Sequence, residues 1–155
     1  MNEAEMAATA LWADYVRAKN NLLKAGIIRS YKSTEGDFSE WLVELIFKGQ
    51  LPDSKSHIGY DVLAGDKKIQ VKSITKMFDN PNGYGVTRKD RQNNPERGAT
   101  HYAFVFFEDL VPDAVYLVPE VFVRTFPKEQ IKRPDFEDKY RVDYDLSGYA
   151  QAMSK

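Results

Sequence analysis

Apolar and polar side chains alternate along residues 61–72, the period-2 pattern of half-buried β-strands. Gly65-Asp66 sits in the middle of this stretch, and a Gly-X pair of this kind closes two-residue hairpins. Such a hairpin places Asp61 opposite Gln70, and Lys72 points to the same face as Gln70. The pattern therefore predicts one polar face with a carboxylate, an amide and an amine. The opposite, apolar face holds Ile58, Tyr60, Val62, Ile69 and Val71.

Helices are predicted on both sides of this hairpin, which we place at 57–75. Residues 3–26 have a helical composition and end at Gly26, a plausible residue after a C-cap, and 28–36 form a polar connection. A second helix is predicted to open at Asp37 and to run to about Gly49. Residues 76–99 are rich in Asn, Gly, Pro and Arg and read as a long loop with a short helix near 88–94.

Further strands and helices are predicted after residue 100. Residues 101–107 and 114–118 have the character of buried strands, joined across the turn-like Pro112-Asp113. Pro119 suits a helix start leading to residue 126, and the polar, aromatic tail closes on a short helix. This order favours an α+β fold, with helices packed on one mainly antiparallel sheet. We expect a single domain over 1–155: an N-terminal helix (1–27), a core (36–126) and a C-terminal extension (127–155).

Composition narrows the class of protein. The chain has 155 residues, of which 43% are apolar and 13% aromatic, which indicates a folded globular protein. It has no cysteine, and this excludes disulfides, thiolate zinc sites and cysteine nucleophiles. There is no apolar run near 18 residues and no signal-peptide pattern at the N-terminus, so a cytoplasmic protein is expected.

The net charge of −1 is unevenly distributed. Residues 66–99 hold eight basic and four acidic side chains, whereas 108–155 hold seven basic and ten acidic ones. A basic surface beside the hairpin suits an anionic partner such as nucleic acid, and ordinary solvated loop charges are the alternative. The candidate contacts to phosphate or bases are Lys76, Arg88, Lys89, Arg91 and Arg97.

The polar face of the hairpin has the chemistry of a Mg²⁺ site. Mg²⁺ takes hard oxygen ligands and keeps several waters, so one or two carboxylates plus a substrate phosphate suffice. Asp61 would anchor the ion, and Gln70 would add its amide or its neighbouring backbone carbonyl. Lys72 would orient or activate a water, or neutralise charge at phosphorus. The alternative is that these three side chains are the wet face of an ordinary amphipathic hairpin.

Two glutamates and a histidine extend this candidate site. Glu40 and Glu44 lie four apart on the preceding helix and so share a face. Each also has a structural interpretation, since Glu40 follows Asp37 as in a capping box and Glu44 can pair with Lys48. His57 precedes the hairpin and is a second-choice neighbour of the site, like Glu44; a structural role is the alternative for both.

Three short motifs, in this order and spacing, resemble the PD-(D/E)XK nuclease superfamily, above all its Holliday-junction resolvase, Mrr-like and small homing endonuclease branches. They are Gly36-Asp-Phe-Ser-Glu40, Gly59-Tyr-Asp61 and Gln70-Val-Lys72, and Val115-Tyr-Leu-Val-Pro119 is similar to a later strand of the family. The resemblance implies a restriction-endonuclease-like core with Glu40, Asp61, Gln70 and Lys72 at the site. Tyr60 stands where the family has proline, and Gln70 replaces the usual acid.

The function that this resemblance implies is Mg²⁺-dependent DNA cleavage, with Mn²⁺ as a substitute for Mg²⁺. Duplex or branched DNA is the expected partner, and one site per chain favours a homodimer or higher homo-oligomer. Two alternatives stay open: a catalytically lapsed module that binds DNA or assembles complexes on the same fold, and an unrelated α+β interaction protein.

Overall fold

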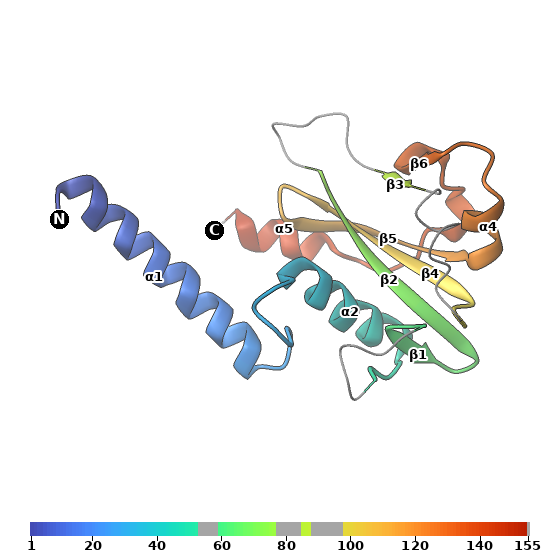
Figure 1. Cartoon of the computed structure of the whole chain (residues 1–155), viewed down its shortest axis with the longest axis horizontal. Helices are drawn as coiled ribbons and strands as arrows, with labels where there is room; N and C mark the ends of the chain where they lie inside the picture. The colour runs from blue at the N-terminus through green and yellow to red at the C-terminus, as the bar shows by residue number, and fades with distance from the viewer. Residues whose placement is uncertain (53–58, 77–84, 88–97, 155) are drawn as a thin grey trace.

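The sheet of this protein has four strands in the order β1-β2-β4-β5, with helices packed against it (Figure 1). The computed structural model describes residues 1–52, 59–76, 85–87 and 98–154. Within these ranges the α-helices are α1 (Glu3–Lys24), α2 (Thr34–Phe47), α4 (Glu120–Thr125) and α5 (Ser147–Met153). The strands are β1 (Val62–Ala64), β2 (Lys67–Lys76), β3 (Gly85–Thr87), β4 (His101–Glu108), β5 (Val111–Pro119) and β6 (Gln130–Lys132). Two short 3₁₀ helices span Arg133–Asp135 and Asp138–Tyr140.

The hairpin between β1 and β2 is confirmed in its predicted register. Val62 pairs with Ile69 and Ala64 with Lys67, so that Gly65-Asp66 forms the two-residue loop. Gly65 adopts a φ of 62°, a left-handed conformation that glycine reaches without steric cost. β2 then pairs in parallel with β4, and β4 pairs antiparallel with β5. The α+β class and the mainly antiparallel, mixed sheet are therefore confirmed.

Each face of the sheet carries its own apolar core. On one face, alternate residues of β2 and β4 pack beneath α2 and α5, and Leu42 and Leu146 belong to this cluster. On the other face, the aromatic residues of β4 and β5 pack against Val123, Ile131 and Phe136. The aromatic strand 101–107 is thus core, since its phenylalanines and Tyr102 are buried.

The end of α2 is fastened to β1. The backbones of Gln50 and Leu63 exchange two hydrogen bonds, of 2.8 Å and 2.9 Å. A Cβ atom on Gly49 would lie 2.7 Å from Cγ1 of Val62 and 2.8 Å from the carbonyl oxygen of Leu63, so only glycine permits this approach. This contact sets α2 directly over the hairpin.

Three predictions about helices are confirmed and one boundary is wrong. α4 is the helix predicted to start at Pro119, which is its N-cap. α1 covers almost all of the predicted helix at 3–26; Asn2 and Glu5 form a capping box, and Gly26 follows the C-cap with a φ of 72°. α5 is the short helix predicted at the end of the tail. α2 begins at Thr34 rather than Asp37, because Asp37 is a buried residue inside its first turns and not a cap.

The turn predicted at Pro112-Asp113 is also wrong. β5 already begins at Val111, and the reversal is made by Asp109 and Leu110, which both adopt positive φ (49° and 67°). Pro112 fits within β5 because β5 is an edge strand, and an edge position tolerates a residue without an N–H donor.

The loop predicted at 76–99 contains β3, which pairs antiparallel with β6. The short helix predicted near 88–94 lies outside the described residues. Among the described residues, no helix is long and apolar enough to cross a membrane.

Candidate functional site

Asp61 lies immediately before β1, at the edge of β2. Its backbone N–H donates to the carbonyl oxygen of Ile69 over 2.8 Å, and its Oδ2 accepts from the backbone N–H of Val71, also over 2.8 Å. These two bonds bracket Gln70, so Asp61 sits beside Gln70 as the register of the hairpin predicts. The carboxylate is therefore held by main-chain atoms in one orientation.

Gln70 and Lys72 occupy alternate positions of β2 and share one face of the sheet. Gln70 pairs in register with Tyr102, and Lys72 with Phe104, which belong to the aromatic core. Gln70 is 9% exposed and is one of three buried polar or charged side chains among the described residues. Lys72 is half-buried. The polar face predicted for the hairpin is therefore not solvent-exposed at Gln70, whose side chain is buried next to the aromatic core.

Glu40 of α2 belongs to the same electrostatic group. Its pKa is raised from 4.5 to about 7, chiefly because burial removes water from the carboxylate and secondly because the charge of Asp61 repels it. The positive charges of Arg29 and Lys72 act in the opposite direction. The structure thus brings Glu40 into electrostatic range of Asp61 and Lys72, although these residues come from a helix, a loop and a strand.

Arg29 is the member of this group that the sequence did not indicate. A buried carboxylate, Asp37, holds the backbone beside it: Oδ2 of Asp37 accepts from the N–H groups of Arg29 and Ser30, each over 2.8 Å. The Arg29 guanidinium also donates to the carbonyl oxygen of Pro52 over 3.1 Å. Asp37 therefore positions the loop that carries Arg29. Arg29 stands alone in a polar connecting segment, so no periodic pattern in the sequence indicates that it belongs to the charged group.

Other candidates do not join the group. Glu44 lines a separate surface pocket of about 500 Å³ with Trp41 and Lys48, and it does not contribute to the shift at Glu40. Lys76 lies at the far end of β2, where its Nζ is 3.8 Å from Oε1 of Glu108. The remaining candidates lie outside the described residues, and these are His57, Arg88, Lys89, Arg91 and Arg97.

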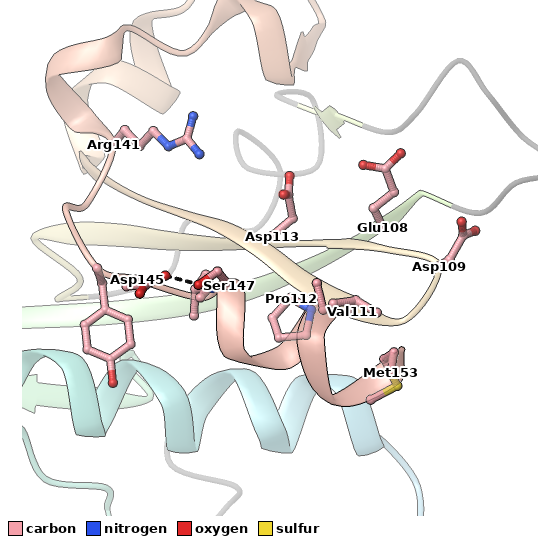
Figure 2. A pocket seen from close by; sticks show the side chains of 12 residues that line it. Glu108, Asp109, Val111, Pro112, Asp113, Arg141, Asp145, Ser147 and Met153 are labelled. Atoms are coloured by element: carbon pink, nitrogen blue, oxygen red, sulfur yellow. Dashed lines mark hydrogen bonds between the residues drawn. The ribbon is translucent and has the colours of Figure 1, made fainter. Parts of the chain in front are cut away.

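A larger pocket, of about 560 Å³, opens between the β4–β5 turn and α5 (Figure 2). Its acidic residues have partners: Glu108 faces Lys76, Asp113 binds Arg133, and Asp145 accepts from the backbone N–H of Ser147. The pocket is at the Glu108 end of the sheet, away from Asp61. It is therefore distinct from the predicted site.

The chemistry of the group around Asp61 fits a divalent cation. Asp61 and Glu40 are near enough for the charge of one to act on the other, and the buried amide of Gln70 lies beside Asp61. Carboxylate and amide oxygens are hard donors of the kind that Mg²⁺ prefers. A cation between them would relieve the repulsion that Asp61 exerts on Glu40. Within the described part of the chain, no three His, Asp or Glu side chains cluster as a metal site. The predicted set contains only two acids, so waters and a phosphate would complete the shell.

Comparison with known proteins leaves the family open. No family model matches the chain, and no curated protein matches it either. The functional argument therefore depends on the residues of this chain.

Proposed function

We propose that the protein is a Mg²⁺-dependent endonuclease that hydrolyses phosphodiester bonds of DNA on a restriction-endonuclease-like core. One observation carries the proposal: the charges of Asp61 and Lys72 both act on the partly buried carboxylate of Glu40, although each of the three residues comes from a different element. In a hairpin whose polar face is simply solvated, a partly buried glutamate from a neighbouring helix is not expected beside the polar residues. The order of the three motifs that resemble PD-(D/E)XK nucleases supports the same assignment.

Each residue then has a defined task. Asp61, Gln70 and Glu40 would hold the metal, which supplies Lewis acidity and a water of lowered pKa. Val71 keeps the Asp61 carboxylate fixed through its N–H, so the site needs little reorganisation when the ion binds. In the reaction, the oxygen of water bonds to phosphorus, one P–O ester bond breaks, and the leaving oxygen gains a proton. The Lys72 ammonium neutralises the negative charge that grows on the phosphoryl oxygens.

The basic residues beyond β2 supply the surface for DNA in this proposal. Lys76 is paired with Glu108 but is more than a third exposed, and the candidate arginines follow it in the chain. Arginine side chains bind phosphate and base edges in a bidentate manner. A homodimer would present two such sites to the two strands of a duplex.

The test is cleavage of supercoiled plasmid in Mg²⁺ or Mn²⁺ by wild type, Asp61→Asn and Lys72→Met. Both variants should lose at least 100-fold in rate while their circular dichroism stays native. Asp66→Asn and Lys68→Met change the same residue types at exposed positions of the same hairpin and should cleave normally. Equal cleavage by the site variants and the wild type would remove the assignment.

A second candidate function, DNA binding without cleavage, is favoured by Gln70. A neutral amide at the centre of the group removes one of the negative charges that would hold Mg²⁺. Binding of DNA that weakens with salt, without cleavage in either metal, would establish this function instead.

A further inference from the structure

Helix α1 exposes large apolar side chains along most of its length. Leu11 is 70% exposed and Trp12 66%, and Tyr15 and Val16 are exposed beside them. None of the 22 residues of α1 is buried. Figure 1 shows α1 extending away from the sheet, with α2 and the strands beyond the loop that follows it. Contiguous exposed apolar surface of this kind marks an interaction site.

The described contacts of α1 with the rest of the chain are confined to its C-terminal part. Nζ of Lys19 donates to the carbonyl oxygen of Tyr31 over 2.8 Å, and the Tyr31 hydroxyl bonds to the side chain of Asn20. Leu22 and Leu23 are half-buried there. The apolar side chains from Ala4 to Val16 are thus left without cover by the described residues.

The exposed side chains form a stripe with the spacing of a two-helix seam. Apolar residues recur in steps of four and three, the a/d pattern of coiled coils. The seam consists of Ala4, Ala8, Leu11, Tyr15 and Ala18, and it ends at the half-buried Leu22. The polar residues Asp14 and Asn21 border the seam on one side, and Arg17 lies away from it. The helix is about 33 Å long, which is three heptads.

The area of this stripe is sufficient for a dimer. Aromatic side chains bury roughly 150–250 Å² each, so Trp12 and Tyr15 with their aliphatic neighbours offer on the order of 500 Å² per chain. Two copies would bury about 1,000 Å², which is the size at which specific protein interfaces begin. The area that two copies of α1 would bury is therefore large enough for a specific dimer.

Glu5 and Lys19 distinguish the two directions in which such helices could pair. Glu5, Trp12 and Lys19 are seven residues apart and so lie on one flank of the seam. In an antiparallel pair with its two-fold axis at Trp12, Glu5 of each copy faces Lys19 of the other. In a parallel pair, residues of this flank face the other flank of the partner (Ala7, Asp14 and Asn21), so Glu5 and Lys19 of the two copies do not meet. The antiparallel arrangement also opposes the two helix dipoles favourably.

We propose that α1 is a dimerisation helix that pairs antiparallel with α1 of a second copy, with Trp12 at the two-fold axis. The apolar seam supplies the affinity, and the two Glu5–Lys19 contacts select the orientation. This inference does not depend on the proposed nuclease activity, because it concerns a different element and is tested by mass in solution.

Sedimentation equilibrium of the full chain tests the interface. The wild type should be a dimer at micromolar concentration, and Leu11→Glu should raise the dissociation constant at least 30-fold. Ala10→Glu is the matched control, since it adds the same charge one position away on the polar side of α1 and should leave the dimer intact. A monomeric wild type, a dimeric Leu11→Glu or a monomeric Ala10→Glu would each overturn the proposal.

A charge exchange tests the orientation. Glu5→Lys alone should weaken the dimer about tenfold, because it places two lysines together at each end of the seam. Glu5→Lys combined with Lys19→Glu should restore the wild-type constant. A dimer that Glu5→Lys leaves unaffected, or that the double variant does not restore, would rule out the antiparallel arrangement.

Discussion

The backbone N–H of Val71 donates to Oδ2 of Asp61 over 2.8 Å, so a main-chain bond of β2 holds the central carboxylate of the candidate site. The bond also satisfies an amide of β2 at a point where the pairing with β1 has ended. Asp61 therefore has a structural task as well as a chemical one.

These two tasks can be separated by substitution. Asp61→Asn keeps an oxygen that accepts from Val71, whereas Asp61→Ala leaves that N–H without its acceptor. We expect Asp61→Ala to be less stable than Asp61→Asn by about 1–2 kcal/mol, the cost of an unsatisfied backbone donor. Urea denaturation measures both free energies of unfolding. Equal stabilities would show that water replaces the hydrogen bond to Val71. In plasmid cleavage, both variants should be equally inactive.

The raised pKa of Glu40 predicts how stability depends on pH. The folded pKa of about 7 exceeds the ordinary value of 4.5, so the folded state binds this proton more tightly. Below pH 4.5 both states are protonated and Glu40 costs nothing. Between pH 4.5 and 7 the unfolded chain releases the proton first, so stability falls, and above pH 7 the penalty is constant.

Glu40→Gln removes this penalty, because it cannot ionise. We expect it to match the wild type near pH 4 and to be more stable by about 1 kcal/mol at pH 8, a value reduced for partial exposure of the side chain. Urea midpoints between pH 4 and 8 give the comparison. A difference that does not vary with pH would mean that Glu40 titrates as in water.

The electrostatic neighbours of Glu40 can be identified one at a time. Lys72→Met and Arg29→Met should each raise its pKa further, because both cations stabilise the carboxylate. Asp61→Asn should lower it, since a repelling charge is lost. Titration of the glutamate side-chain carbons by NMR measures the shifts, and Lys68→Met on the exposed side of the hairpin should produce none. A pKa that is unmoved by Lys72→Met would separate Lys72 from the site.

Metal binding should appear as a change in stability. A Mg²⁺ ion bound with a Kd of about 1 mM adds roughly 1.4 kcal/mol at 10 mM metal. We expect Mg²⁺ to raise the Tm of the wild type relative to EDTA, and Asp61→Asn to abolish this effect. Gln70→Glu should bind Mg²⁺ more tightly and be less stable without it, because a third carboxylate joins two that already repel. If Mg²⁺ does not change the Tm of Gln70→Glu, this result would contradict a metal site at Asp61 and Gln70.

The parts of this molecule that were predicted from sequence are those determined by neighbours in the chain. Alternation and Gly65-Asp66 were sufficient for the hairpin and its register, because a two-residue loop fixes which residues oppose. The turn at Pro112-Asp113 was wrongly predicted, since an edge strand accepts proline. The true reversal uses Asp109 and Leu110, and leucine is rarely found with positive φ.

The parts that were missed depend on contacts between distant segments. Asp37 was interpreted as a helix start, yet it is buried and binds the backbone at Arg29 and Ser30. Nothing in the spacing of these residues distinguishes such a contact from a cap. The pairing of Lys76 with Glu108 likewise follows from the parallel register of β2 and β4, which joins residues more than thirty positions apart.

The charged group around Asp61 is complete before the chain crosses from β2 to β4. Every member, from Arg29 to Lys72, belongs to one continuous segment, and the strands that follow supply burial and pairing. A scan of all single substitutions would therefore separate two phenotypes by position. Losses of activity with normal expression would concentrate in 29–72 and at the proposed DNA contacts from Lys76 to Arg97, whereas losses of expression would extend through β4 and β5.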